Sequence, residues 1–512
     1  MGAVEELFVL SQPLSVSKTK KDMTKCSPLQ SRSSCGMIYL WYFAAMCDGR
    51  DPMRIGRSTD MTQGTIWKQL LSFAAPMLLG LIFQQMYNTV DSIVVGNYVS
   101  SQALAAVGTT GPLINTLLGF FNGFSTGATV VIARAYGARD RKSVHDAVHT
   151  TILTTFLMAI LFTGLGMYLT PYLLRMMKTP GDMMSEATTY LRIYFMGVSG
   201  LMFYNMGAGI LRAVGDSRRP LYFLVFSAIV NTAGDLIFVL VFHMGVAGVA
   251  YATILAQALS AMLVLYVLAR SDGPYKLFFR RLCIKLPVLR QIVGIGLPTA
   301  LQGAITAFSN VFVQSYINAF GSDCAAGWSI YGKLDQFALL PQQSLSAANT
   351  TFVGQNLGAG NVPRAKRGTR VALTMGALCT CTLMVPLMAF SKPLLSLFNQ
   401  KPEVLYYGSL FVMWISPFYL FTCVNDILGG ALRGAGEAFP TMVCMLSCFV
   451  VIRQIYLYIV SHVTHDAVLV GLGYPLGWVC CAISLVLCYR LLPWEKKQAA
   501  LHAQAEMDEK EV

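Results

Sequence analysis

Twelve long apolar runs separated by short polar loops constrain the fold of this chain more than any other feature. Each run can cross a hydrocarbon layer of about 30 Å, which takes roughly 20 residues in a helix. Lipid offers no partners for backbone polar groups, so such runs cross it as α-helices. Only 12% of the residues are charged, which excludes an ordinary soluble protein. The runs lie near residues 66–95, 102–132, 143–170, 185–212, 219–242, 246–270, 290–319, 324–354, 368–390, 404–432, 439–461 and 467–491.

Basic residues gather in the loops that follow even-numbered runs, whereas most loops after odd-numbered runs contain no Lys or Arg. The exceptions lie near Arg175 and Lys178 and near Lys392 and Lys401. The positive-inside rule places the basic loops and both termini in the cytoplasm, which predicts a multi-pass protein of the plasma (inner) membrane. The net charge of +13 then indicates contact with anionic membrane lipids and not with nucleic acid.

The two sets of six runs resemble each other. "LRAVGD" at 211–216 matches "LRGAGE" at 432–437, and "YGARD" at 136–140 matches "LGAGN" at 357–361, both at a shift of 221 residues (432 − 211 and 357 − 136). Because six is an even number, both halves enter the membrane from the same side. The pattern predicts an all-α protein of two six-helix bundles, related by a pseudo-two-fold axis along the membrane normal.

The domain organisation follows from these runs and from the basic linker "RSDGPYKLFFRRLCIKLPVLR". Residues 1–52 contain no spanning run and no signal-peptide flanks, so Met53 and Met61 are alternative natural starts. We expect a disordered N-terminal extension at 1–60, a first six-helix bundle at 61–270, a cytoplasmic linker at 271–289, a second bundle at 290–492 and a cytoplasmic tail at 493–512.

Two acidic residues interrupt the apolar runs of the first half. Asp91 lies in "MYNTVDSIVVGN", and Asp235 lies four residues after Asn231 in "VNTAGDLIF". A charged side chain at mid-bilayer costs about 2.5–3.5 kcal/mol, so it usually has a function. The positions about 221 residues later are apolar or aromatic, which makes these polar residues peculiar to the first half. The alternative interpretation is that both acids only satisfy backbone or hydroxyl groups between helices.

Thr253, in "AYATILAQ", completes an oxygen-only set with Asp91, Asn231 and Asp235. Oxygen ligands suit a hard cation, and two neighbouring carboxylates suit a shared proton. We expect the two acids to titrate as one coupled unit if they meet. The set is thus a candidate cation-coupling site, and a metal site for Na⁺ if the protein is sodium-coupled.

The chain resembles the multidrug and toxic compound extrusion family of cation-coupled antiporters. The resemblance covers about residues 60–492 and depends on "FAAPMLLGLIFQQMYNTVDSIVVG", "VNTAGDLIF", "TFVGQNLGAGN" and the paired arginine loops. It implies export of cationic amphipathic compounds in exchange for Na⁺ or H⁺. In one branch of the family, the residues that match Asp91, Asn231, Asp235 and Thr253 form the coupling site.

Another branch of that family places coupling acids in the C-terminal bundle. Here the second half contains Lys333, Asp335, Asp426 and Arg453. Lys333 and Asp335 are close in sequence, so we expect them to neutralise each other, although a coupling role for this group stays open.

The candidate substrate contacts are polar and aromatic residues near the acids. Tyr87 lies four residues before Asp91 and so shares its helix face. The 26 Met residues suit a cavity that repacks around varied ligands, although ordinary helix packing explains any single one. The candidates are Gln84, Tyr87, Asn88, Tyr190 and Asn205, with Phe308 and Phe312 as further ones.

Two other function classes are alternatives to an antiporter. A flippase for a lipid-linked precursor, from the same superfamily, needs cationic groups around a pyrophosphate, and Arg453 and Lys333 are the deep candidates. An enzyme needs a nucleophile or metal set at mid-membrane, and the sequence shows neither that nor a phosphate-binding P-loop. We therefore expect a monomeric transporter of small molecules with no cofactor apart from the coupling ion.

Overall fold

The computed structural model describes residues 60–177, 179–181, 183–464 and 466–494, all within one compact unit. The predicted extension at 1–60, apart from Asp60, and most of the tail lie outside the described residues. The first half contains α2 (Ile66–Tyr98), α3 (Ser101–Gly137), α4 (Arg141–Met176), α5 (Met184–Met196), α6 (Val198–Ala213), α7 (Arg218–Leu236), the π-helix η2 (Ile237–Val241) and α8 (Gly245–Arg270).

The second half contains α9 (Leu286–Asn318), α10 (Ser322–Gly358), α11 (Val362–Ala389), α12 (Ser391–Ser396), α13 (Pro402–Ile415), η4 (Ser416–Phe418), α14 (Tyr419–Gly434), α15 (Ala438–Leu446), the π-helix η5 (Ser447–Ile452), α16 (Arg453–Val463), α17 (Ala467–Gly471) and α18 (Gly473–Leu491). A short 3-10 turn, η3 (Phe279–Arg281), lies in the linker between the halves. Every predicted run is helical in this described part of the chain.

Among the described residues, ten helices are long and apolar enough to span a membrane, and the pair α5 and α6, bent by 46°, makes eleven. The remaining predicted run is α10, which is too polar for this test. It packs against α2, α3, α11, α13 and α14. Its polar side chains, such as Gln342 and Asn349, are therefore buried against protein and hydrogen-bonded there.

The predicted duplication is visible in the contacts between helices. In the first half, Ser125 Oγ donates to the carbonyl of Asn205 at 2.8 Å and Thr129 Oγ1 donates to that of Gly209 at 3.2 Å. The second half repeats both bonds at a shift of 221 residues (346 − 125). Ser346 Oγ donates to the carbonyl of Asp426 at 2.6 Å, and Thr350 Oγ1 donates to that of Gly430 at 3.0 Å.

The loops matched in sequence also share a backbone conformation. Arg139 and Gly360 occupy equivalent positions and have φ of 60° and 76°. The next residue in each loop caps the following helix, because Asp140 accepts from the backbone of α4 and Asn361 accepts from that of α11. Such side-chain caps satisfy backbone groups that the first helical turn leaves unpaired.

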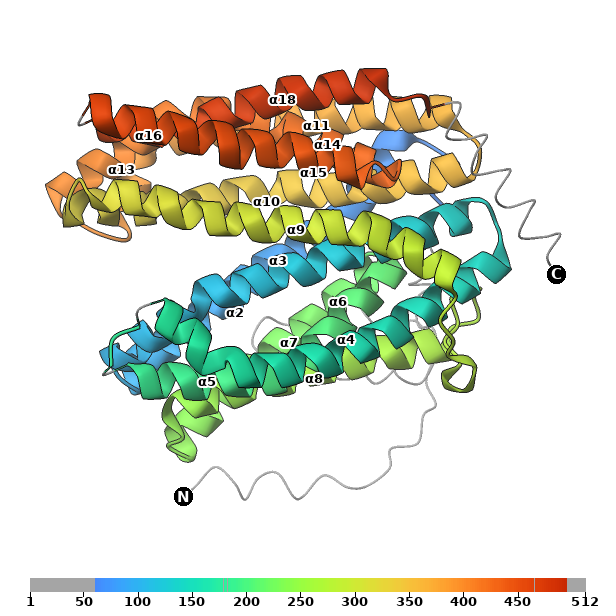
Figure 1. The fold of residues 1–512 in the computed structure, drawn as a ribbon, viewed down its shortest axis with the longest axis horizontal. Helices are drawn as coiled ribbons and strands as arrows, with labels where there is room; N and C mark the ends of the chain where they lie inside the picture. Colours follow the sequence, from blue (N-terminus) through green and yellow to red (C-terminus); the bar gives the residue numbers. More distant parts are fainter. Residues whose placement is uncertain (1–59, 178, 182, 465, 495–512) are drawn as a thin grey trace, which may run out of the picture. The chain divides into compact units, whose positions relative to one another are not determined.

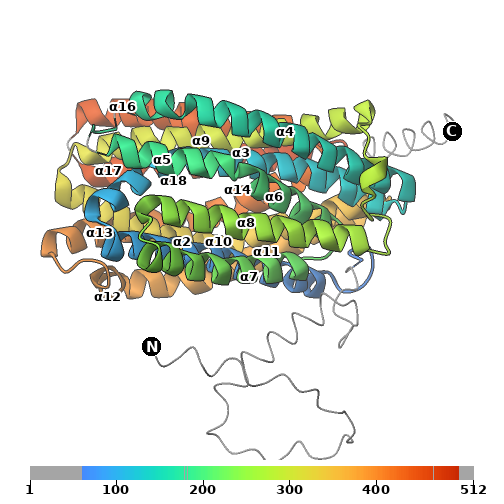
Figure 2. The same cartoon turned by 90° about the horizontal axis from the view of Figure 1, so that it is seen from below.

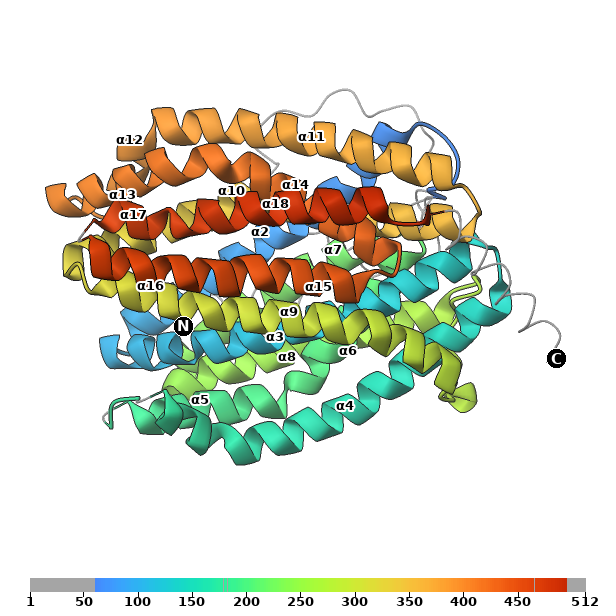
Figure 3. The same ribbon diagram turned by 45° about the horizontal axis from the view of Figure 1, so that its top comes forward.

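The two halves meet through α3, which packs along α9 and against α10 (Figures 1 and 3). Glycine permits the close approach, since a Cβ at Gly123 or Gly127 would overlap the backbone of α9. At the end of α3, a Cβ at Gly137 would meet the carbonyl of Gln355, and one at Gly358 would meet that of Arg134. The two contacts are related by the same shift of 221 (358 − 137).

Side-chain bonds reinforce this crossing symmetrically. Arg134 Nη2 donates to the carbonyl of Gly434 at 3.1 Å, and Gln355 Nε2 donates to that of Ala213 at 2.7 Å. We call this end of the helices the basic end, because it also carries the basic loops. Met61 docks here too, since its backbone nitrogen donates to Gln355 Oε1 at 3.1 Å.

The linker between the halves is tied to α4. His149 Nδ1 donates to the carbonyl of His145 at 2.8 Å, which leaves Nε2 to accept from the backbone nitrogen of Phe278 at 3.1 Å. Thr150 Oγ1 accepts from the backbone nitrogen of Lys285 at 3.2 Å. The linker therefore adheres to the first half up to the beginning of α9.

We expect Gly358→Ala to destabilise the protein by about 1–3 kcal/mol, because overpacking at a close helix crossing forces the backbones apart. Thermal unfolding of purified protein, followed by tryptophan fluorescence, checks this. Gly294→Ala is the control, since a Cβ there meets nothing within 4 Å. An unchanged midpoint for Gly358→Ala would contradict the close crossing.

Candidate functional site

The structure brings Asp91 of α2 and Asp235 of α7 together. Their carboxyl groups lie within hydrogen-bonding reach of each other. Asp235 is 0% exposed, and neither of its carboxylate oxygens receives a hydrogen bond from the described residues. Asp91 Oδ1 is likewise buried without a donor. A buried carboxylate pair with no donor is costly unless a proton or a cation compensates it.

Asn231 and Thr253 lie beside this pair. Asn231 Nδ2 donates to Thr253 Oγ1 at 3.4 Å, and Thr253 Oγ1 donates to the carbonyl of Val249 at 3.0 Å. These bonds use the Thr253 hydroxyl and one N–H of Asn231, and Asn231 Oδ1 stays buried without a partner. The unpaired atoms of the cluster are thus all oxygen acceptors, which fits a hard cation or a proton.

The positions of these side chains follow from local helix geometry. Asn231 and Asp235 are one turn apart on α7, and α7 lies beside both α2 and α8 (Figure 2). The π-helix η2 begins two residues after Asp235. Such π-bulges occur frequently at functional sites, because they redirect side chains at the expense of regular bonding.

Tyrosines enclose the acidic pair. Tyr87 hydrogen-bonds to Gln84 and interacts electrostatically with Asp91. Tyr190 is 7% exposed and interacts with both Asp91 and Asp235. Three of the predicted substrate contacts, Gln84, Tyr87 and Tyr190, therefore belong to one cluster with the acids.

The sequence reasoning missed three members of this cluster. Tyr194 interacts with Tyr87 and hydrogen-bonds to the amide of Gln257, whose Oε1 is buried without a partner. Tyr204 interacts with Tyr87 and donates to the carbonyl of Pro220 at 3.2 Å. The spacing of Gln257, four residues after Thr253 on α8, was a signal that would have found it.

Other predicted contacts are placed differently. Asn205 Nδ2 donates to the carbonyl of Leu201, one turn earlier on its own helix, at 2.9 Å. Asn88 is exposed. Phe308 and Phe312 on α9 are 62% and 50% exposed and form an edge-to-face pair with centroids 5.4 Å apart.

The expectation that Lys333 and Asp335 neutralise each other is wrong. Residues two apart point to different sides of a helix, and no ion pair joins these two in the described structure. Lys333 is exposed and lies over the ring of Phe398 at 5.4 Å. Asp335 instead accepts from Tyr331 OH at 3.2 Å, and Tyr419 OH donates to Tyr331 OH at 3.4 Å.

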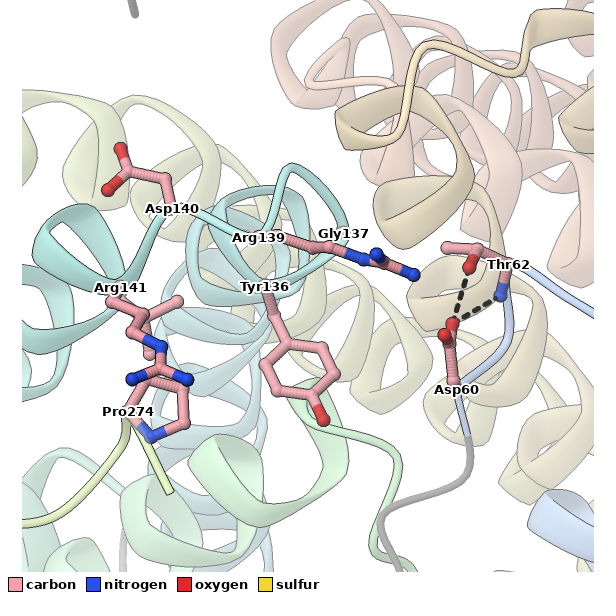
Figure 4. Close-up of a pocket in the computed structure, with 9 residues that line it drawn as sticks. Asp60, Thr62, Tyr136, Gly137, Arg139, Asp140, Arg141 and Pro274 are labelled. Atoms are coloured by element: carbon pink, nitrogen blue, oxygen red, sulfur yellow. Dashed lines mark hydrogen bonds between the residues drawn. The ribbon is translucent and has the colours of Figure 1, made fainter.

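A cavity of about 240 Å³ lies elsewhere, at the basic end. Asp60, Tyr136, Arg139 and Arg141 are among its lining residues (Figure 4), and Arg139 extends toward Asp60. None of the predicted site residues lines this cavity. Its lining contains two aspartates and two arginines, so the formal charges of these side chains cancel.

Comparisons with known proteins agree on one family. The MatE family model matches twice, at residues 76–237 and 298–459. The chain is 31% identical to the probable multidrug resistance protein YpnP of Bacillus subtilis, over 86% of this chain and 98% of that protein. It is 26% identical to the probable multidrug resistance protein NorM of Thermotoga maritima, over 74% of this chain and 82% of that protein.

The fold is similar to that of a solved MATE-family multidrug resistance transporter of the MOP superfamily, described as outward-facing. The TM-score is 0.80 at 23% identity, over 88% of this chain and 100% of the other. The twofold match of the family model, at a shift of 222 residues (298 − 76), reproduces the internal duplication. The chain is thus a multi-pass membrane protein of two related helical halves.

We expect Asp235→Asn to leave the thermal midpoint unchanged or to raise it at pH 8. The substitution keeps the size of the side chain and replaces an acid that receives no donor from the described residues and faces a second carboxyl group, so it adds neither repulsion nor desolvation cost. Thermal unfolding of the purified variant measures this. A midpoint several degrees lower would mean that the Asp235 carboxylate stabilises the fold through a bond to protein.

Proposed function

We propose, from the premise that this chain belongs to the MatE family, that it is a multidrug efflux transporter driven by secondary active antiport. It exports cationic amphipathic compounds in exchange for Na⁺ or H⁺. The observation that carries the proposal is the cluster of unpaired buried oxygens on Asp91, Asn231 and Asp235. Membership of a transporter family indicates that the protein transports its substrates and does not convert them.

The coupling cation binds to the acidic pair of the first half. Asp91 and Asp235 come from different helices, α2 and α7, so binding between them changes how these helices pack. Tyr87 and Tyr190 interact with the same carboxylates and form part of the substrate surface. Cation and drug therefore compete for one cluster, which links uptake of one to release of the other.

The membrane topology completes the proposal. We place the basic end in the cytoplasm, as the positive-inside rule favours. The crossing of α3 with α9 and α10 then holds the two halves together on the cytoplasmic side. Rocking of one half against the other reverses the access.

The driving force is sufficient for export of a neutral compound. One positive charge that moves inward across 100 mV supplies about 2.3 kcal/mol, which supports roughly a 50-fold gradient. Export of a cationic compound uses part of this energy, so the stoichiometry determines the final gradient.

A lipid-linked precursor flippase is the alternative. A pyrophosphate carries at least two negative charges and requires several cations around it. Lys333 is exposed and lies over Phe398, which leaves Arg453 as the buried cation of the two that the sequence suggested. This charge balance favours the antiporter.

We expect Asp91→Asn and Asp235→Asn each to abolish ethidium efflux while the protein stays inserted in the membrane, because the amide cannot exchange a proton or pair with Na⁺. Ethidium fluorescence in energised cells, normalised to the membrane protein level, measures the rate. Asp323→Asn is the matched control, since Asp323 is half-exposed and forms a 4.0 Å surface pair with Lys401. Normal efflux from either well-expressed acid variant would refute the assignment.

Replacement of Na⁺ by choline at constant pH identifies the coupling ion in the same assay. We expect efflux to stop in choline if Na⁺ is the coupling ion, and to persist until the proton gradient is collapsed if H⁺ is. Efflux that survives both treatments together would contradict secondary antiport.

A further inference from the structure

A buried arginine lies in the second half, away from the acidic pair. Arg453 begins α16 and is 3% exposed. Its guanidinium is a permanent cation, since arginine is not deprotonated in proteins. A buried charge of this kind is normally neutralised by an acid, so the partners of Arg453 decide what it does.

Every partner of Arg453 in the described structure is neutral. Its Nη2 donates to Ser309 Oγ and to Asn310 Oδ1, both at 2.9 Å, and its guanidinium stacks over Tyr474 at 4.6 Å. Its Nε is buried and has no hydrogen-bond partner. No ion pair between described residues includes it.

Asp335 lies in the same region but hydrogen-bonds to another side chain. Asp335 interacts electrostatically with Tyr474, but its carboxylate accepts from Tyr331 OH at 3.2 Å. Arg453 therefore has no acid in contact with it among the described residues, and it keeps a free N–H donor. Guanidinium groups with free donors are the preferred partners of carboxylates and phosphates.

The arginine is reachable through Asn310. Asn310 lies seven residues after Gly303, so both occupy the same face of α9. Gly303 packs against Gly119 of α3, which means that this face is turned toward the first half. Asn310 is exposed, and so no helix of the first half covers it. Because Asn310 also accepts from the guanidinium, displacement of its side chain exposes a donor of Arg453 on this face.

The backbone marks the same position. The π-helix η5 ends at Ile452, directly before Arg453. The other π-helix, η2, begins two residues after Asp235. The two π-helices are not related by the repeat shift, because 237 + 221 is 458, whereas η5 begins at Ser447. Each half thus contains a π-helix next to a buried ionisable residue, and π-helices occur frequently at functional sites.

We infer that Arg453, with Ser309 and Asn310, forms an anion-binding site on the face of the second half that is turned toward the first. It binds a carboxylate or phosphate group of the transported compound. The inference rests on the proposed function and narrows its substrate class. The first half recognises a cationic group, and the second recognises an anionic one, so zwitterionic amphiphiles satisfy both.

Two dyes that differ in one group test the site. Rhodamine B carries a cationic ring system and a free carboxylate, and its ethyl ester lacks the negative charge. We expect Arg453→Gln to weaken binding of rhodamine B to the purified protein at least about tenfold, equivalent to about 1.4 kcal/mol, while the ester changes less than about twofold. Fluorescence polarisation gives both dissociation constants from one preparation.

The ratio of the two dissociation constants does not depend on the folded fraction of the sample. Arg453→Lys keeps the charge but loses the planar fork, so we expect an intermediate ratio. Lys392→Gln is the matched control, since it removes an exposed cation from the same half and should leave the ratio unchanged. Equal weakening of both dyes in Arg453→Gln, or failure of the wild-type protein to bind rhodamine B, overturns the inference.

Competition separates the possible sources of the anionic group. Displacement of rhodamine B by inorganic phosphate, or by phosphatidylglycerol in mixed micelles, supports anion recognition and shows whether a free anion or a lipid headgroup shares the site. Absence of ethidium efflux from cells that express the wild-type protein would overturn the proposed antiport and not the anion site. The binding ratio would still decide the role of Arg453.

Discussion

The contact of α3 with α9 and α10 determines how the rest of the molecule is arranged. It depends on glycines whose missing side chains let the backbones touch, above all Gly123, Gly137 and Gly358. Dispersion forces act only over short distances, so close approach is what holds helices together where lipid removes the hydrophobic drive. Arg134 and Gln355 add hydrogen bonds to opposite carbonyls at the same place. Contact between the halves is therefore strong at the basic end.

The molecule combines symmetric architecture with asymmetric chemistry. The hydroxyl bonds of Ser125 and Ser346, and the left-handed turns at Arg139 and Gly360, recur in both halves because both use the same helix packing. The buried charges do not recur. The pair of Asp91 and Asp235 belongs to the first half, and the buried Arg453 belongs to the second. The two halves thus share their helix packing and differ in the buried charged residues that each contains.

Much of the fold follows from the sequence, and some of the site does not. The apolar runs located all twelve predicted spans and the alternating charge supported their number, including α10, which fails a strict hydropathy test because it carries polar residues that are buried against protein. The i, i+4 spacing of Asn231 and Asp235 correctly predicted a shared face, but the contact of Asp235 with Asp91 depends on how α2 packs on α7. The pairing of Lys333 with Asp335 was wrong because proximity in sequence does not mean proximity on a helix. Neither π-helix carries a recognisable sequence signal.

The attachment of the linker to α4 has a mechanical consequence. The backbone nitrogens of Phe278 and Lys285 donate to His149 and Thr150. While these bonds last, the linker between them moves together with the first half. Any relative rotation must be absorbed at the entrance to α9, near Leu286. The segment that is free to change conformation between the two halves is therefore shorter than the linker itself. Its length, and not the length of the whole loop, limits how far one half can rotate against the other.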